Sequence, residues 1–130
     1  MLNLKWAKRG VVWSIVIILI LTILEFPSPI GFETRPQDNV SILWLIFFLI
    51  ILITEIVTVS LILKHPRLGV KFAICAAILN ILQIFADQLH LMQPEIASFG
   101  YTLLEYSVGI VALFLAYFAF KIYRFISPAV

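Results

Sequence analysis

The sequence predicts an all-α integral membrane protein, a four-transmembrane-helix bundle with both termini in the cytoplasm. Hydrophobic residues make up 63% of the 130 residues and charged residues only 12%, whereas an average soluble domain has about 25% charged residues. The apolar residues also gather in four long runs, separated by charged residues, prolines and turn residues. So few charges cannot cover the surface of a soluble domain, and so apolar a chain does not stay disordered.

The first predicted span covers residues 11–26. It begins after Arg9 and ends at Pro27, because proline has no amide proton and disfavours helix in the residue before it. A short apolar run after basic residues is also typical of a signal peptide, but no small-residue cleavage site follows Glu25 and Phe26. We therefore interpret this run as a retained membrane span.

Three further runs are long enough to cross a bilayer core of about 30 Å, which takes about 20 helical residues. They cover residues 41–63, 68–89 and 97–120. The turn at 64–66 separates the second run from the third, and Lys121 ends the fourth. The connections are too short to hold a second domain, so we expect one membrane domain that includes the whole chain.

The Lys and Arg residues are distributed unequally between the two sides of this predicted bundle. Four spans place both termini on the same side, and that side carries eight of the nine basic residues, while Arg35 alone lies on the other. Cytoplasmic loops carry the excess of Lys and Arg, so the termini are predicted to be cytoplasmic. The short loops and the lack of a targeting segment favour the cell membrane as the host. The eight residues are Lys5, Lys8, Arg9, Lys64, Arg67, Lys71, Lys121 and Arg124.

Small residues recur on one face of each of the last two runs. Gly109, Ala112 and Ala116 follow helical spacing in the fourth run, and Ala73 and Ala77 do so in the third. Membrane helices approach one another through such small residues. The third and fourth helices are therefore predicted to pack as an antiparallel pair, while the bulkier first two helices face lipid or a partner.

Glu55 is the only charged residue of the second run and lies near its middle. Ionisable residues inside a span are costly and mark a pathway, a site or a pair. Glu55 is interpreted as a proton-binding or cation-binding carboxylate, to which Thr58 on the next turn could donate a hydrogen bond. The alternative is a protonated or paired glutamate that fixes helix contacts or a partner subunit.

Other polar residues converge on the outer ends of the last two helices, where Glu25 could join them. One interpretation is a polar cleft open to the outer face that binds a cation, a quinone headgroup or a small polar ligand, with His90 or Asp87 handling protons. The other is a hydrogen-bonded network that only holds the two helices together. The candidate residues are Asn80, Gln83, Asp87 and His90 on the third run and Glu105 on the fourth.

Several kinds of chemistry are excluded or unsupported by the sequence. A single cysteine permits no disulfide within the chain, and no nucleotide-binding, nucleophile-elbow or paired-histidine motif is present. The basic residues lie at helix ends and not on one patch, which argues against nucleic acid. We therefore expect no catalytic residue, no metal and no cofactor.

Three functions remain open at this point. The first is an accessory or structural subunit of a larger membrane complex, in contact with the lipid bilayer and with other membrane subunits. The second is a self-sufficient homo-oligomeric transporter or channel, coupled to protons or cations through Glu55 and the polar cleft. The third, for which the sequence offers less, is a membrane enzyme or a binding protein for a lipid or quinone.

Overall fold

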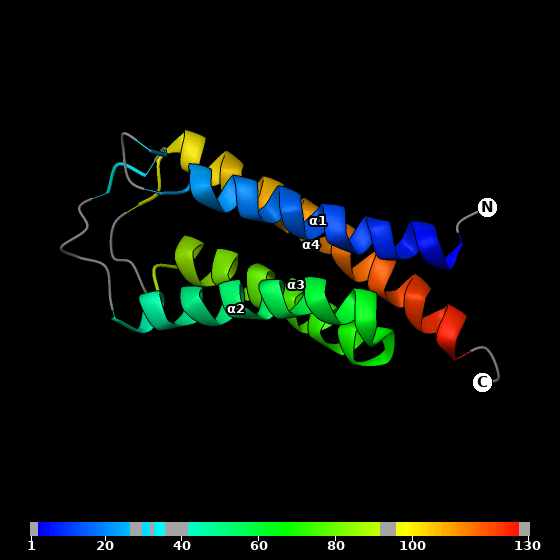
Figure 1. Cartoon of the computed structure of the whole chain (residues 1–130). Coiled ribbons are helices and arrows are strands. Elements are labelled where there is room, and N and C mark those ends of the chain that lie inside the picture. The colour runs from blue at the N-terminus through cyan, green and yellow to red at the C-terminus, as the bar shows by residue number, and fades with distance from the viewer. Residues whose placement is uncertain (1–2, 27–29, 32, 36–41, 92–95, 128–130) are drawn as a thin grey trace.

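Four helices make up nearly all of the described chain in the computed structural model, which describes residues 3–26, 30–31, 33–35, 42–91 and 96–127. They are α1 (Leu4–Leu24), α2 (Ile42–Lys64), α3 (Pro66–Gln88) and α4 (Phe99–Ile126). Each is long and apolar enough to cross a membrane. Consecutive helices run in opposite directions, and both termini lie at the same end as the α2–α3 turn (Figure 1). The described residues therefore have the all-helical architecture of a multi-pass membrane protein.

The helices extend beyond some of the predicted apolar runs. The first helix already begins at Leu4, because the side chain of Asn3 caps it and accepts a hydrogen bond of 3.0 Å from the backbone N–H of Trp6. The last helix continues past Lys121 to Ile126. Hydropathy identifies only the part of a helix that suits lipid, whereas the helix itself continues until its backbone groups are capped. Ser41, where the second run was predicted to begin, lies outside the described residues.

The turn between α2 and α3 is a single residue, His65. Pro66 then occupies the first turn of α3, where its missing N–H costs no hydrogen bond. This sharp reversal brings Gly69 against the backbone of α2. A Cβ atom on Gly69 would lie 2.7 Å from the nitrogen of Ile62 and 2.8 Å from its Cα. A glycine is therefore required at this close approach.

Replacing Gly69 by alanine is expected to destabilise the α2–α3 hairpin. Forcing an extra methyl group into a packed contact typically costs about 1–3 kcal/mol. Thermal unfolding in detergent, followed by circular dichroism, would measure the effect of G69A. The matched control is G100A, because a Cβ at Gly100 meets no atom within 4 Å. Equal unfolding temperatures for the two variants would contradict the expected clash.

Each helix packs mainly against one or two of the others. The closest pairings are α1 with α4, α2 with α3 and α3 with α4, while α1 and α2 share a smaller contact. Small residues fill the interior, as expected where helices approach closely without large side chains. Of the predicted packing residues, Ala73, Ala77 and Ala112 are buried, and Gly109 and Ala116 are partly buried. The α3–α4 pair is antiparallel (Figure 1).

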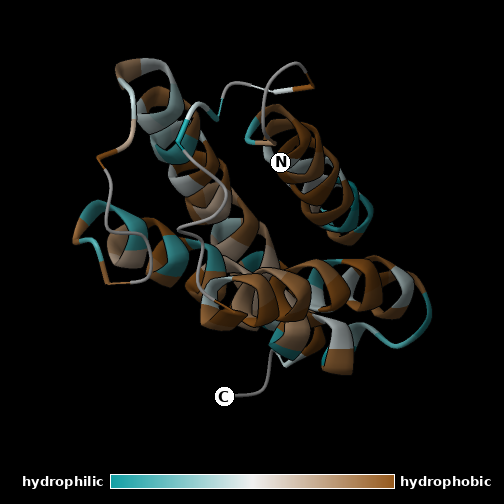
Figure 2. Cartoon of the chain, turned by 90° about the vertical axis from the view of Figure 1, so that its left-hand side faces the viewer, coloured by the Kyte–Doolittle hydropathy of each residue, from teal (hydrophilic) through white to brown (hydrophobic). Residues whose placement is uncertain are grey.

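The outer surface of the four helices is dominated by apolar side chains. Figure 2 shows that most residues of the four helices are hydrophobic. α2 is the most exposed helix of the four over its apolar stretch, with Ile53, Ile56 and Leu63 all more than half exposed. Such a surface suits hydrocarbon, since water would be a poor solvent for so large an apolar area.

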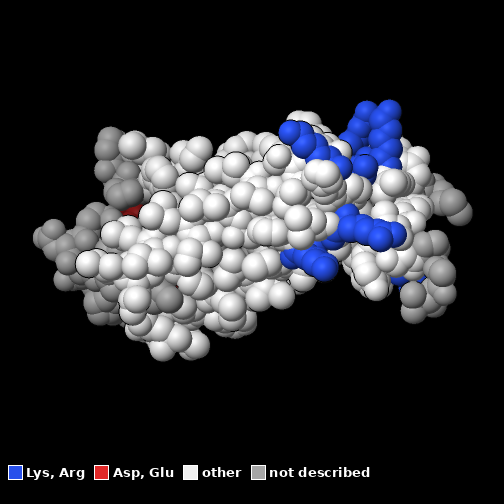
Figure 3. All heavy atoms as spheres, turned by 60° about the horizontal axis from the view of Figure 1, so that its bottom comes forward, with Lys and Arg blue, Asp and Glu red and all other residues white. Residues whose placement is uncertain are grey.

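The basic residues are concentrated at one end of the molecule. Lys and Arg gather at the end that holds the termini and the α2–α3 turn, here called the terminal end (Figure 3). The opposite end, here called the Arg35 end, holds the α1–α2 and α3–α4 connections. This arrangement agrees with the prediction that four spans place eight of the nine basic residues on the side of the termini.

Candidate functional site

A buried ion-pair network lies at the Arg35 end. The Arg35 guanidinium donates from Nη1 to Asp87 Oδ1 at 2.8 Å and from Nη2 to Glu33 Oε2 at 2.7 Å. Arg35 is 6% exposed and Asp87 only 2%. Arg35 and Glu33 belong to the α1–α2 connection, and Asp87 lies in the last turn of α3. The network therefore fastens this connection to the bundle.

The chain folds back tightly after α1 to bring Arg35 into position. The N–H of Glu33 donates to the carbonyl oxygen of Phe26 at 3.2 Å, and the N–H of Arg35 donates to Glu33 Oε1 at 2.9 Å. Gly31 passes so close to the carbonyls of Leu24 and Phe26 that no Cβ would fit there. The Phe26 ring also packs against Phe48 of α2, with a centroid distance of 6.2 Å.

Tyr101 connects the same guanidinium to α4. The Arg35 Cζ atom lies 4.8 Å from the centroid of the Tyr101 ring, within the range of a cation–π contact. Tyr101 is 1% exposed. Its backbone N–H donates to the Oγ of Ser98, the N-cap residue of α4, at 3.2 Å. The first turn of α4 is thereby held against the α1–α2 connection.

Glu105 adds a further carboxyl group from the second turn of α4. Gln88 Nε2 donates to Glu105 Oε1 at 2.6 Å, and Asp87 lies within hydrogen-bonding reach of the same carboxyl. Glu105 is 1% exposed. The residues that meet here are called the Arg35 cluster, and they comprise Glu25, Glu33, Arg35, Asp87, Gln88, Tyr101 and Glu105.

Three members of the Arg35 cluster lie outside the helices, and two of them, Glu25 and Arg35, have raised pKa values. Burial and the neighbouring carboxylates of Asp87, Glu33 and Glu55 together raise the pKa of Glu25 to about 8, against the lowering effect of the nearby Arg35. Burial alone would lower the pKa of Arg35, but its hydrogen bonds to Glu33 and Asp87 outweigh that effect and raise it. Arg35 is thus permanently charged, while Glu25 titrates near neutral pH.

The Arg35 cluster contains more acids than bases. Four carboxyl groups (Glu25, Glu33, Asp87 and Glu105) surround one guanidinium, and no other Lys or Arg occurs between residues 10 and 63 or between 72 and 120. Full ionisation would leave three uncompensated negative charges in a buried place. Such burial costs far more than folding can supply, so the cluster must carry protons or attract a cation.

Glu55 is buried separately in the middle of the bundle. Asn80 Nδ2 donates to Glu55 Oε1 at 2.8 Å and to the carbonyl oxygen of Ala76 at 2.9 Å. Glu55 is 1% exposed. The hydroxyl of Thr58 donates to the carbonyl of Thr54 at 2.6 Å, so the expected hydrogen bond from Thr58 to Glu55 is wrong. A serine or threonine hydroxyl in a helix readily bonds the carbonyl four residues earlier.

Three predicted polar residues of α3 form a row inside the bundle. Asn80, Gln83 and Asp87 recur every three or four residues on one helix face, and all three are buried. Gln88, not Gln83, hydrogen-bonds Glu105. Glu105 is buried beside this row, and Arg35 of the α1–α2 connection bonds its outermost member, Asp87.

His90 does not join this network through its side chain. It is exposed, and its backbone has a positive φ of 58° just beyond the end of α3. Its backbone N–H donates to the carbonyl oxygen of Asp87 at 3.1 Å. The residue thus ends the helix, and its imidazole lies outside the Arg35 cluster.

The sequence reasoning missed Glu33, Arg35, Tyr101 and Gln88 as members of the site. A signal for Arg35 was present, since it is the one basic residue in a region that holds several acids. Its pairing was not foreseen because the connection was read only as a turn. In the part of the chain that the structure describes, no three His, Cys, Asp or Glu side chains are grouped so as to hold a metal ion.

No protein-family profile, no curated protein and no solved structure matches this chain. The geometry of the site is therefore the basis for any statement about function.

Proposed function

We propose that this chain is a proton- or cation-coupled membrane transporter or channel that works without foreign subunits. The observation that carries the proposal is the position of Glu55, buried at mid-bundle and hydrogen-bonded to Asn80 of the same chain at 2.8 Å. A glutamate that served to dock a partner would face outward, whereas this one faces α3. Intramembrane carboxyl groups that turn inward are typical of ion and proton pathways.

The polar row of α3 supports a path between the Arg35 cluster and Glu55. Asp87 and Asn80 are seven residues apart, or about 10 Å along a helix, and Gln83 lies between them on the same face. Beyond Asn80, toward the terminal end, the buried residues are mainly apolar, such as Ile62, Val70 and Ala73. The buried hydroxyl of Thr58 is bonded to the carbonyl oxygen of Thr54. We therefore expect a polar path that leads from the Arg35 end to Glu55 at the middle of the bundle. The mainly apolar interior beyond Glu55 closes this path toward the terminal end.

In this proposal, the excess carboxyl groups of the Arg35 cluster couple the movement of a cation to the release of protons. Protons neutralise the excess carboxyl groups at rest, and an incoming cation that displaces them exchanges one positive charge for another. Glu25 suits this role because its pKa of about 8 allows it to release a proton near neutral pH. The positive-inside rule would place the Arg35 end outside and the termini in the cytoplasm of a cell-membrane protein.

The test is proton movement into proteoliposomes that contain the purified chain and a pH-sensitive dye, under an imposed membrane potential. We expect the wild type to conduct or exchange protons and Glu55→Gln to abolish this movement. Glu55→Asp is the matched variant, because it retains a carboxyl group, and it should keep part of the activity. Equal activity of wild type and Glu55→Gln would overturn the role of Glu55.

A measurement that needs no knowledge of the cargo accompanies the flux assay. A hydrophobic carbodiimide modifies protonated carboxyl groups inside a membrane, and peptide mass spectrometry locates the modified residue. We expect modification at Glu55 that declines as the pH is raised. Absence of both modification and flux in a folded sample would remove the proposal.

An accessory-subunit role is the second candidate, and the exposed apolar surface of α2 favours it. More of α2 is open to its surroundings than of any other helix over the apolar stretch, so a neighbouring subunit could cover it. Mild extraction from native membrane followed by native mass spectrometry discriminates the two. Stoichiometric foreign subunits would favour the accessory role, and the chain alone or as a homo-oligomer would favour the transporter.

A further inference from the structure

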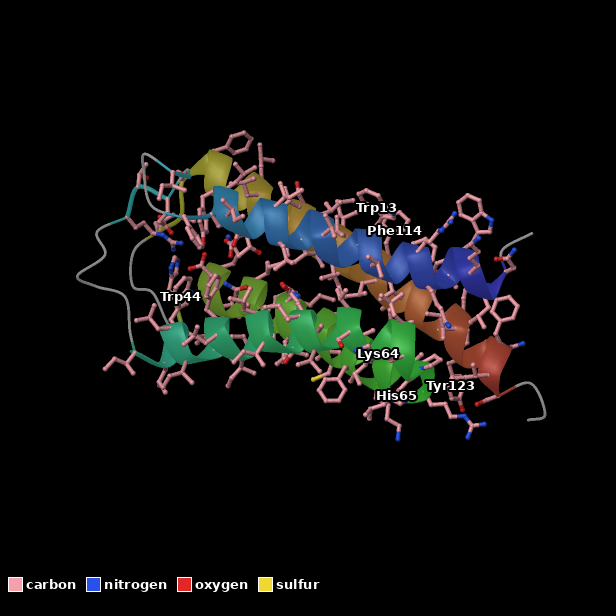
Figure 4. The ribbon with its side chains drawn as sticks, in the orientation of Figure 1. Trp13, Trp44, Lys64, His65, Phe114 and Tyr123 are labelled. Carbon is pink, nitrogen blue, oxygen red and sulfur yellow. The ribbon has the colours of Figure 1, made fainter. Side chains whose placement is uncertain are left out.

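A groove between α1 and α4 opens on the outside of the bundle near the terminal end. α1 lines it with Trp6, Arg9, Trp13 and Ile17, and α4 contributes Phe114 among others. Figure 4 shows Trp13 and Phe114 close together on one side of the molecule. The groove has a volume of about 650 Å³, which falls within the range of about 300–1,000 Å³ that small-molecule sites occupy.

The length of the groove fits one leaflet of a bilayer. Trp6 and Ile17 are eleven residues apart, which corresponds to about 16 Å of helix. Half of a hydrocarbon core of about 30 Å is about 15 Å. The lining side chains are almost all apolar or aromatic, and Trp13 and Phe114 are more than half exposed. An acyl chain is therefore the apolar group that matches both the length and the lining.

The polar end of the groove is positively charged. Arg9 is the one charged residue among those that line it, and its guanidinium carbon lies 5.7 Å from the centroid of the Trp6 ring. Lys5 and Lys8 are on the same turns of α1, whereas none of the seven acids of the chain precedes residue 25. A guanidinium binds phosphate oxygens through paired hydrogen bonds, so the charge is complementary to an anionic headgroup.

We propose that this groove binds one anionic phospholipid, with an acyl chain between α1 and α4 and the phosphate on Arg9. Trp6 then lies near headgroup level, where tryptophan is enriched in membrane proteins, and Trp13 lies about two turns deeper, beside the acyl chain. Basic pockets between membrane helices select anionic headgroups in this way. The site is separate from the Arg35 cluster, which lies at the other end of the bundle, and it does not depend on the transport proposal.

The experiment is native mass spectrometry of the purified full chain, mixed with equal amounts of phosphatidylglycerol and phosphatidylcholine that carry the same acyl chains. We expect one phosphatidylglycerol to be retained in preference. Arg9→Gln should weaken this retention by about tenfold, the loss typical of a hydrogen bond to a charged group. Arg124→Gln is the matched control, since Arg124 is exposed at the same end but does not line the groove.

A second pair of variants tests the apolar part of the groove without changing charge. Ile17→Trp should fill the groove and displace the lipid, while Ile20→Trp places the same side chain on α1 outside the groove; both isoleucines are more than 40% exposed. Circular dichroism verifies that each variant is helical. Equal retention of the two lipids by the wild type would overturn the proposal, as would equal losses for Arg9→Gln and Arg124→Gln.

Discussion

Replacing Arg35 by glutamine is expected to lower the free energy of unfolding by about 3–5 kcal/mol, the usual effect of removing one partner of a buried ion pair. The change leaves Glu33 and Asp87 buried without their cation, with side chains only 9% and 1% exposed. It also removes the cation–π contact with Tyr101. Thermal unfolding in detergent, at fixed pH and salt, would measure the loss.

The control for this prediction is Arg67→Gln, because Arg67 is an exposed arginine at the terminal end. It removes the same charge but no described buried contact. Adding Asp87→Asn to Arg35→Gln should recover part of the lost stability, since it removes one of the two unpaired charges. If Arg35→Gln proved as stable as Arg67→Gln, the Arg35 cluster would not be holding the α1–α2 connection to the bundle.

Stability should also depend on pH through Glu25. Its pKa is about 8 in the folded chain and 4.5 as the ordinary value, so the folded state retains a proton that the unfolded state loses. The stabilising effect of this proton is complete below about pH 4.5 and is lost as the pH rises to about 8. The expected decrease over that interval is about 5 kcal/mol, at about 1.36 kcal/mol per pKa unit.

Unfolding temperatures measured between pH 5 and pH 8 would test this dependence. Glu25→Gln, which cannot ionise, should flatten the decline. His90→Gln is the matched control, because histidine ordinarily titrates in the same interval and His90 is exposed at the same end of the molecule. The prediction would be wrong if the unfolding temperature still fell with rising pH in Glu25→Gln but no longer did so in His90→Gln.

The four helices could be predicted from the sequence because membrane helices are determined locally. About 20 apolar residues bury themselves in hydrocarbon whatever their neighbours do, and lipid forces their backbone groups to pair within the segment. The same local logic identified Glu55 and Asp87 as costly residues that required partners. The helix ends were less well predicted, because a cap such as Asn3 lies outside the apolar run that hydropathy identifies.

The partners themselves were decided only by the tertiary structure. Arg35 meets Asp87 across 52 positions of the chain, and Asn80 meets Glu55 across 25. Helical periodicity states which residues share a face, but not which face turns toward which neighbour or where a connection folds back. The sequence alone determined the number of helices and the separation of charges between the two ends of the bundle. The pairing of the buried charges had to come from the fold, because it depends on the path of the α1–α2 connection over the ends of α3 and α4.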